Sequence, residues 1–499
     1  MTAVILGGGV SGLASAYYLV RNSSPFKRII LLEASDRLGG WIQTSRLDNG
    51  AIFEHGPRSL RPAGQGGKNT LSLATELGLS NDIIAVTRNH PSTKNRYIYM
   101  NKKLNRLAIG GGFKNTFYPQ PPFSKSVFSM VINELRAPVP DNDIEDESIH
   151  SFFSRRIGQE VADYLLDPVF RGIFAGDISK LSVKSCLPMD VLKIEKEYKS
   201  LMRGVIRRKD KDDDNEVYAM NDIMRATKER WSTWSFQKGM QQLSERLEDV
   251  IIRRGNVEIR KSTPCRGLEF NGDQVQVITD TESLTADHVV SSIFSQDLSK
   301  LLGSQQDELA NLLNQITAVS CIVVNVEYKD YVSNIEGFGH LLPSSEDPCV
   351  LGVIYDSSTF KQHDAEKYVS SRYTMMLGGA WYDELVDRLG DLKESTIQDY
   401  ACKVLSEQLD IKTEPSNVVV TIQKNCIPQY FVGHSKLVES IDKCVSDSAL
   451  PLSLVGSSYK GVSVNDCIHN AKMTLKQFDH GIKKVESPDA EIIEKSSNV

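Results

Sequence analysis

The sequence predicts an α/β fold with α+β inserts, organised around a discontinuous, Rossmann-like domain that binds a dinucleotide. Three observations predict it. An apolar run at residues 3–6 leads into a glycine-rich turn and a helix-like stretch at residues 13–21. A second apolar run, at residues 29–32, ends at the acidic Glu33. A third run, at residues 452–455, again leads through glycines toward a helix-like stretch. The domain is therefore expected to be assembled from distant parts of the chain.

The first glycine turn has the residue types that a pyrophosphate requires. Gly7 permits a tight turn out of the strand, Gly9 lets backbone N–H groups approach the phosphates, and Gly12 lets the helix pack closely against the sheet. The phosphates then lie at a helix N-terminus, where unpaired N–H groups and the positive end of the dipole favour anions. The whole turn is Gly7-Gly8-Gly9-Val10-Ser11-Gly12.

The continuation of the motif indicates which dinucleotide is bound. Glu33 can accept hydrogen bonds from ribose hydroxyls, and its carboxylate would repel a 2′-phosphate, which argues against NADP. The following residues place an arginine and two glycines where the chain passes the pyrophosphate again: Glu33-Ala34-x-x-Arg37-x-Gly39-Gly40-Trp41. A flavin is therefore predicted rather than a nicotinamide.

This long motif resembles the N-terminus of the flavin amine oxidase superfamily. The resemblance implies one non-covalent FAD per chain and a fold like those of amine oxidases and p-hydroxybenzoate hydroxylase. It also implies that a second helix tip, near residues 456–464, faces the flavin ring and stabilises the charge of its reduced form. The expected cofactor residues are Gly7, Gly8, Gly9, Val10, Ser11, Gly12, Glu33, Ala34, Arg37, Gly40, Trp41, Gly56, Pro57, Arg58, Ser59, Cys265, Val462, Ser463 and Val464.

The chain is expected to divide into three domains and a tail. The FAD-binding domain is assigned to residues 1–62, 226–295 and 451–480, with a strand near residue 231, a helix at 241–247 and an Asn271-Gly272 hairpin. A mixed-sheet substrate domain takes residues 63–90 and 296–450, with strands at 321–328, 350–355 and 373–377 and a helix at 396–409. A helical, membrane-associated domain takes residues 91–225, and residues 481–499 form a flexible tail.

The helical domain contains the expected membrane contact. After a proline-rich break, Ser124 is expected to cap a helix whose apolar face is formed by Val127, Phe128, Val131, Ile132 and Leu135. Lys114, Lys125 and Arg136 flank it, so the helix suits a lipid interface; a core helix explains the pattern equally well. A charged run at residues 208–216 is expected to be a solvated loop. No apolar run is long enough to span a bilayer.

Composition excludes several other classes of function. The 499 residues are 40% hydrophobic and 24% charged with a formal net charge of −6, so a globular protein of two or three domains is expected and nucleic-acid binding is not. The eight cysteines show no C-x-x-C pair and no metal-ligand spacing, so no metal is expected. The first strand begins almost at once, so no cleavable targeting segment is expected ahead of the fold.

Several stretches resemble, more narrowly, the animal and fungal protoporphyrinogen oxidase family. They include residues 49–58, 121–125, 172–176, 337–348 and 425–430. The resemblance implies oxidation of protoporphyrinogen IX to protoporphyrin IX by O2, with release of H2O2, in three two-electron steps with hydride transfer to flavin N5. It places this reaction in haem biosynthesis, at the intermembrane-space side of the mitochondrial inner membrane. A peripheral homodimer that hands its product to ferrochelatase is also implied.

The same resemblance assigns substrate contacts but no catalytic side chain. Arg96 is the expected anchor for a propionate, through charge-assisted hydrogen bonds. Arg58 and Trp41 are expected to position the flavin. The expected wall of the substrate slot is Phe338, Gly339, Leu341, Ile354, Met376 and Ile427.

Two alternatives remain open at this point. An amine or polyamine oxidase would use the same flavin domain, but its site suits a neutral amine and not an anionic substrate. A non-catalytic binding protein like the Rab GDP-dissociation inhibitors shares the glycine-rich architecture. Flavin absorbance in the purified protein would argue against this second alternative.

Overall fold

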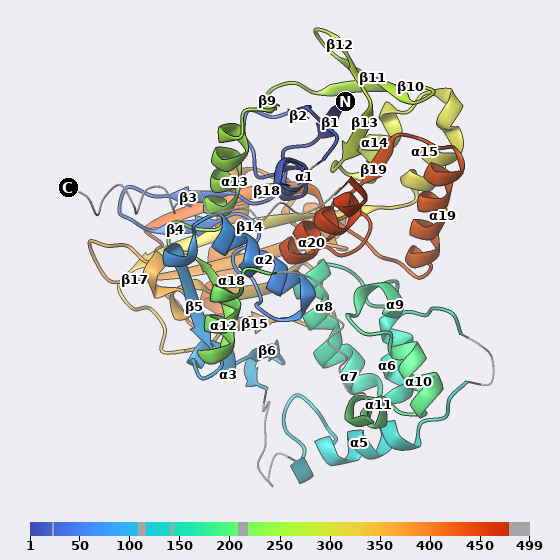
Figure 1. The fold of residues 1–499 in the computed structure, drawn as a ribbon. Helices are drawn as coiled ribbons and strands as arrows, with labels where there is room; N and C mark the ends of the chain where they lie inside the picture. Colours follow the sequence, from blue (N-terminus) through green and yellow to red (C-terminus); the bar gives the residue numbers. More distant parts are fainter. Residues whose placement is uncertain (22–23, 108–115, 141–143, 208–217, 479–499) are drawn as a thin grey trace.

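The computed structural model describes residues 1–21, 24–107, 116–140, 144–207 and 218–478. Figure 1 shows two sheet-containing regions, with a group of helices, α5 to α11, at the lower right. Lys114, the charged run at 208–216 and the expected tail at 481–499 lie outside the described residues.

Five parallel strands form a dinucleotide-type sheet in the order β19-β13-β1-β2-β9. Neighbouring strands come from distant parts of the sequence, as the discontinuous fold requires. The side chains alternate between two cores: Ile5 and Leu31 face one, and Val4 and Ile30 face the other. The interior residues of the central strands are apolar because both faces of the sheet are covered. They are β1 (Thr2–Leu6), β2 (Arg28–Leu32), β9 (Val257–Arg260), β13 (His288–Ser291) and β19 (Leu452–Leu454).

Helices cover one face of this sheet, and a small antiparallel sheet with further helices covers the other. The first group is α1 (Val10–Arg21), α2 (Gly64–Glu76), α12 (Met220–Lys228), α13 (Gln241–Arg253) and α20 (Val464–Leu475). The second is β10 (Cys265–Asn271), β11 (Gln274–Thr279), β12 (Ser283–Ala286), α14 (Ser295–Leu301), α15 (Asp307–Asn314) and α19 (His434–Asp447). The predicted hairpin is confirmed, since β10 pairs with β11 and Gly272 has φ +61°.

A seven-stranded mixed sheet has the order β18-β14-β17-β16-β15-β6-β7. The strand pair β15 and β6 is parallel and the other neighbours are antiparallel. The structure adds β6 and β7 to its edge, although residues 97–106 were expected in the helical domain, because Tyr97 pairs with His340. The strands are β18 (Asn417–Pro428), β14 (Ala318–Lys329), β17 (Ser370–Gly379), β16 (Val350–Tyr355), β15 (Gly339–Leu341), β6 (Tyr97–Met100) and β7 (Lys103–Arg106).

Two helices, α17 (Tyr382–Leu389) and α18 (Glu394–Leu409), pack on this second sheet. The three strands and the helix predicted for the second insert are therefore confirmed. Shorter elements connect the two sheets: β3 (Thr44–Arg46), β4 (Ile52–Glu54), β5 (Ile83–Thr87), α3 (Pro91–Lys94), β8 (Trp231–Phe236) and α16 (Asp356–Thr359). The strand predicted near residue 231 pairs with β5 and so lies outside the parallel sheet.

The helical insert has its own apolar core, which includes Ile149, Phe152 and Phe170. At one side, the fully buried Arg156 is paired with the carboxylates of Glu134 and Glu195. No helix in the described ranges combines the length and apolarity needed to span a membrane. The insert comprises α5 (Val127–Arg136), α6 (Ile149–Arg156), α7 (Gln159–Val161), η2 (Ala162–Leu166), α8 (Asp167–Phe174), α9 (Val183–Cys186), α10 (Val191–Tyr198) and α11 (Leu201–Arg207).

The expected cap of α5 is wrong by two residues. Ser126 is the N-cap, and its Oγ accepts from the Ser129 N–H at 3.2 Å. The N–H and hydroxyl of Ser124 instead donate to the carboxylate of Glu160, so its side chain is already used. Two serines close together both suit a cap, and a long-range partner decides between them.

Candidate active site

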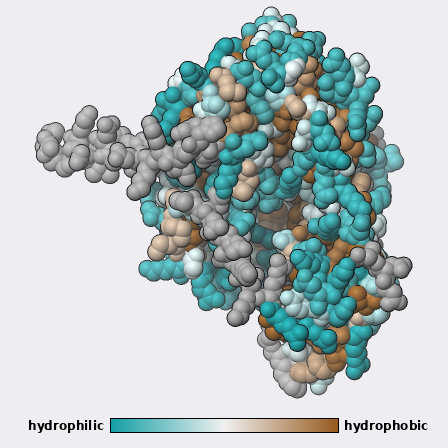
Figure 2. All heavy atoms as spheres, turned by 45° about the vertical axis from the view of Figure 1, so that its right-hand side comes forward, coloured by the Kyte–Doolittle hydropathy of each residue, from teal (hydrophilic) through white to brown (hydrophobic). Residues whose placement is uncertain are grey.

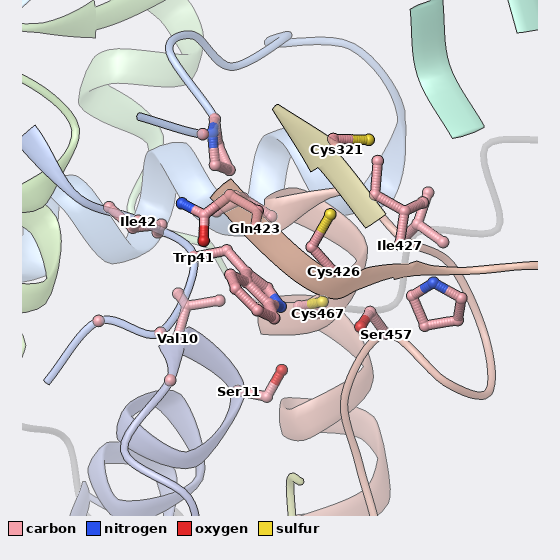
Figure 3. A pocket seen from close by; sticks show the side chains of 18 of the residues that line it. Val10, Ser11, Trp41, Ile42, Cys321, Gln423, Cys426, Ile427, Ser457 and Cys467 are labelled. Carbon is pink, nitrogen blue, oxygen red and sulfur yellow. The ribbon is translucent and has the colours of Figure 1, made fainter. Parts of the chain in front are cut away.

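A cavity of about 650 Å³ lies where the parallel sheet meets the mixed sheet (Figure 3). One side is formed by the β1–α1 turn, the loop after residue 38 and the segment that leads into α20. The other is formed by β14, β16, β17 and β18. Most expected residues line it: Gly7, Gly9, Val10, Ser11, Glu33, Gly40, Trp41, Gly56, Pro57, Arg58, Ser59, Val462, Val464, Phe338, Ile354, Met376 and Ile427.

At the base of the glycine turn, where α1 packs against β1, there is no room for a side chain. On its other side, at Gly9, the turn borders open space. A Cβ at Gly12 would lie 1.9 Å from the carbonyl oxygen of Gly7, so the helix could not approach the strand as closely. Gly7 itself has φ +96°. At Gly9 the nearest atom to such a Cβ is 3.8 Å away, in Gly40, so this glycine borders open cavity. The turn therefore fits an anionic group at the tip of α1.

Glu33 is held at the end of β2 by three donors. Its Oε2 accepts from the Gly8 N–H at 2.6 Å, and its Oε1 accepts from the N–H and hydroxyl of Ser35 at 2.8 and 2.7 Å. Because the carboxylate also lines the cavity, its remaining lone pairs can accept from hydroxyl groups of a ribose.

Arg37 does not line the cavity and instead shapes the loop beside it. Its Nη2 donates to the carbonyl of Gly40 at 2.7 Å. The loop then meets the glycine turn, where the Gly39 N–H donates to the Gly8 carbonyl at 2.9 Å. Trp41 follows and remains 41% exposed at the cavity. The arginine therefore acts on the cavity through the backbone that it holds.

The second helix tip carries a capping box. Ser463 is the N-cap of α20, its Oγ accepts from the Asp466 N–H, and the Asp466 carboxylate accepts from the Ser463 N–H. The N–H of Ser463, one of the expected cofactor residues, is therefore already bonded within the helix cap. Val462 and Val464 line the cavity on either side of this cap.

Arg58 carries the polar group best placed to meet a ligand. Its Nη1 donates to Asp356 Oδ1 at 3.0 Å, and both side chains are almost buried, with 11% and 15% exposed. Its Nη2 is buried and has no partner among the described residues. Since Arg58 lines the cavity, an acceptor on a bound molecule would satisfy this donor.

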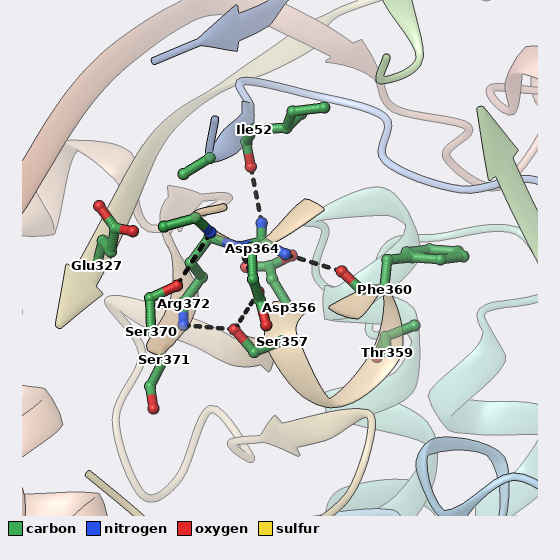
Figure 4. A network of polar contacts seen from close by, with 12 residues as sticks. Ile52, Glu327, Asp356, Ser357, Thr359, Phe360, Asp364, Ser370, Ser371 and Arg372 are labelled. Atoms are coloured by element: carbon green, nitrogen blue, oxygen red, sulfur yellow. Dashed lines mark hydrogen bonds and ion pairs between the residues drawn. The ribbon is translucent and has the colours of Figure 1, made fainter. Parts of the chain in front are cut away.

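Asp356 lies beside a polar network that is centred on Arg372 (Figure 4). Its Oδ2 accepts from the Thr374 hydroxyl at 2.6 Å. In the adjacent network, Asp364 accepts from Arg372 Nε at 2.9 Å and from the hydroxyl of Ser357, the residue after Asp356, at 2.6 Å. Burial raises the pKa of Asp364, although Arg372 opposes this. The network joins α16 to β17 and holds the carboxylate toward Arg58.

Some expected residues lie away from the cavity. Gly339 has φ +149° and meets β16, where a Cβ would lie 2.2 Å from the Val353 carbonyl oxygen. Leu341 lies beside Gly172. Cys265 begins β10. Six other expected residues are also absent from the lining of the cavity: Gly8, Gly12, Ala34, Arg37, Arg96 and Ser463.

Arg96 lies next to the Phe338 end of the cavity. The Phe338 N–H donates to the carbonyl of Asn95, the residue before Arg96, at 3.1 Å. Desolvation, and then the nearby cation of Arg61, lower the pKa of Arg96. Neither arginine forms an ion pair with another described residue. Because these two cations lie close to each other, they favour an anionic group bound beside them.

Sequence reasoning missed several residues of the lining because long-range strand pairing brings them together. His55 is one of them: burial, and then Arg37 and Arg58, lower its pKa, which favours the neutral form of the ring. Only the strand register between β14 and β18 could have indicated those on the mixed sheet. The missed residues include Ile42, His55, Gly172, Ile173, Ser292, Phe294, Cys321, Val323, Gln423, Asn425, Cys426, Pro428 and Cys467.

Comparison with known proteins agrees with this architecture. Residues 10–474 match the family described as flavin containing amine oxidoreductase, and the chain belongs to that family. It is 41% identical to human protoporphyrinogen oxidase over 472 residues, which cover 94% of this chain and 97% of the human protein. Identity to the protoporphyrinogen oxidase of Schizosaccharomyces pombe is 32%, over 96% of this chain and 98% of that protein.

A solved structure of a protein from Exiguobacterium sp. 255-15 has the same fold. The TM-score is 0.76 at 24% identity, covering 96% of this chain and 98% of that one. The α/β fold with a mixed second sheet is thus that of the flavin amine oxidases.

Proposed function

We propose that this protein is an FAD-dependent oxidase that converts protoporphyrinogen IX to protoporphyrin IX with O2 as acceptor and H2O2 as product. Relatives named protoporphyrinogen oxidase align over almost the whole chain. The observation that carries the proposal is the composition of the cavity, which joins a glycine cradle to an apolar wall and includes the almost buried cation of Arg58. An apolar tetrapyrrole with two propionates fits such a wall.

FAD is proposed to bind without a covalent link. The α1 tip would hold the pyrophosphate and Glu33 the ribose, while the backbone at Val462 and Val464 would lie along the ring. When bound, the flavin supplies a two-electron oxidation and passes the electrons to O2. The amine oxidase alternative would use the same cradle but needs no cation for its substrate.

The chain's own residues would orient the substrate and exclude water. Phe338, Ile354, Met376 and Ile427 form an apolar surface for the ring. Arg96, with Arg61 beside it, would pair with the propionates at the open end. Arg58 would donate its free Nη2 to an acceptor within the cavity. No side-chain base is assigned: three hydrides leave the methylene bridges, and of the three protons that leave with them two come from pyrrole N–H groups and one from the fourth bridge.

The test begins with the purified protein. Flavin absorbance bands together with porphyrin fluorescence from protoporphyrinogen IX are expected, with no oxidation of amines. Arg96→Ala should raise KM about tenfold or more with flavin content intact, since a charge-assisted pair is lost. Arg266→Ala, on the distant β10, is the control and should leave KM unchanged. A colourless folded protein, or oxidation of amines alone, would overturn the proposal.

The proposal includes a peripheral membrane contact through the helical insert. Exposed apolar side chains gather on α5 and α11: Val127 and Phe128 on the first, and Met202, Val205 and Ile206 on the second. These helices are packed together, and apolar atoms are visible at the lower edge of Figure 2. Lys125, Arg136, Arg203 and Arg207 are exposed around them. Apolar residues bordered by cations suit the surface of an anionic membrane.

Vesicle flotation tests this contact. Ile206, 78% exposed, is replaced by Glu; binding to vesicles of phosphatidylcholine with phosphatidylglycerol should fall about tenfold, or about 1.4 kcal/mol. Ile252→Glu, at a 52% exposed position on α13, is the matched control. Equal losses in both variants would argue against a contact at the insert. The resemblance further supports location at the mitochondrial inner membrane, on its intermembrane-space side, a homodimer, and hand-over of the product to ferrochelatase.

A further inference from the structure

The cavity wall contains two thiols that the proposed oxidation does not use. Cys321 belongs to β14 and Cys426 to the neighbouring β18, and both line the cavity (Figure 3). All eight cysteines of the chain are free. These two belong to one apolar cluster, with Met376 and Ile427 of the expected substrate wall beside them.

An irregularity in the strand pairing brings the two cysteines to the same side. Cys321 pairs with Gln423, and Val319 pairs with Ile427, so Ser320 alone stands opposite residues 424–426. Asn425 within this bulge has φ +49°. Residues that follow one another on a regular strand face opposite sides. Here residues 425–428 all line the cavity, because the bulge turns Cys426 toward it.

The surroundings of the pair favour reaction between its members. Cys321 is 1% exposed, and the Cys426 thiol donates to the Val319 carbonyl at 3.5 Å. Contact with Cys426, and then burial, raise the pKa of Cys321 well above its ordinary value. Contact with Cys321 lowers the pKa of Cys426. Cys426 is only partly buried whereas Cys321 is buried, so Cys426 has the sulfur that a small oxidant in the cavity reaches first, and Cys321 is its neighbour.

We propose that Cys321 and Cys426 are a peroxide-responsive pair that closes reversibly to a disulfide within the cavity wall. The Cys426 thiolate attacks one oxygen of H2O2, which gives a sulfenic acid and, after protonation, one water. The Cys321 sulfur then attacks the sulfenic sulfur, and a second water leaves. Two thiols are oxidised and one H2O2 is reduced to two waters. The source of peroxide inside the cavity rests on the proposed function; the reactivity of the pair toward added peroxide does not.

Mass spectrometry of the flavin-loaded protein tests the pair. After exposure to equimolar H2O2 and alkylation without reductant, we expect one linked peptide pair, Cys321 with Cys426, two hydrogens lighter than the thiol form and lost on treatment with dithiothreitol. Cys321→Ser should leave a Cys426 sulfenic acid that dimedone traps. Cys402→Ser, on α18 outside the cavity lining, is the control and should retain the link. Absence of the link, or sulfinic acid at either residue instead of it, would overturn the proposal.

A second arm separates this inference from the proposed function. Protoporphyrinogen IX and O2 replace added peroxide, with and without catalase. The link should form during turnover. Catalase should lower the yield of the linked peptide pair to the extent that peroxide leaves the cavity before it reacts with the thiols. A link that forms with added peroxide, in a protein that oxidises no porphyrinogen, would uphold the pair and reject the proposed function. A protein that turns over porphyrinogen but never forms the link with either source would do the reverse.

Discussion

The two sides of the cavity are built by different means. On the side of the parallel sheet, backbone atoms of the β1–α1 turn and of the segment before α20 form the surface, and glycines make it possible. On the side of the mixed sheet, the surface consists of side chains from β14, β16, β17 and β18, with Arg58 and Asp356 as a buried ion pair at its edge. A backbone surface tolerates no added atom, whereas a side-chain surface tolerates changes of shape but not the loss of a charge partner.

The largest expected effect is at Gly12. Because a Cβ there would lie 1.9 Å from the Gly7 carbonyl, Gly12→Val should destabilise the fold by more than about 4 kcal/mol and abolish flavin content. Absorbance and circular dichroism measure both. Gly303→Ala is the control, since a Cβ there meets only Gln306 at 3.8 Å. A Gly12→Val protein that retains flavin would contradict the statement that the backbone surface tolerates no added atom.

The next largest effect is on stability as a function of pH and concerns Glu54. This residue joins β4 to the residue before α13, on the side of the cavity that is formed by backbone atoms. Its carboxyl accepts from the Met240 N–H at 2.7 Å and the Thr44 hydroxyl at 2.8 Å. Burial raises its pKa to about 7. As pH rises, the Glu54 carboxyl ionises at a lower pH in the unfolded chain than in the folded protein. The free energy of unfolding should therefore fall by about 3 kcal/mol as pH rises from about 4.5 to 7.

Glu54→Gln should remove that fall, whereas Thr44→Val should extend it to higher pH, because the lost hydroxyl favours the charged form. Chemical denaturation at a series of pH values measures the free energies. Identical pH profiles for the wild type and Glu54→Gln would contradict the assignment.

On the side-chain surface the largest effect is expected at Asp356. Asp356→Asn keeps the shape but removes the charge that holds Arg58, so kcat/KM should fall about 100-fold through misplacement of the guanidinium. Asp364→Asn is the matched control, since Asp364 is a neighbouring buried carboxylate that pairs with Arg372 rather than with Arg58. It should lower the melting temperature and change kcat/KM only a few-fold. Equal kinetic losses would mean that the network acts only through stability.

The smallest effect is expected in the apolar wall. Met376→Leu conserves volume, so it should cost less than about 1.5 kcal/mol and change KM only a few-fold. Thermal unfolding and steady-state kinetics measure these changes. Loss of flavin in this variant would show that the side-chain surface is as intolerant as the backbone one.

The same contrast explains how much could be predicted from the sequence. Gly7, Gly9, Gly12 and Glu33 lie close together in the chain, and their spacing alone predicts the turn and the dinucleotide. Cys321, Gln423 and Cys426 meet only because β14 pairs with β18 through a bulge, which no local pattern signals. The Ser124 prediction was wrong for the same reason, since Glu160, 36 residues away, binds this serine. Local geometry is encoded locally, whereas contacts across the sheet depend on register.

The order of the parallel sheet has a consequence for synthesis of the protein. Strand β1 lies 450 residues before β19 in the chain, as Leu452 follows Thr2, and β13 separates the two strands within the sheet. At about 5–20 residues per second, the first strand waits on the order of 20–90 s for the last piece of its sheet. The cradle formed by the tips of α1 and α20 is therefore incomplete until the segment near Val464 has been synthesised, so a dinucleotide cannot contact both tips before then.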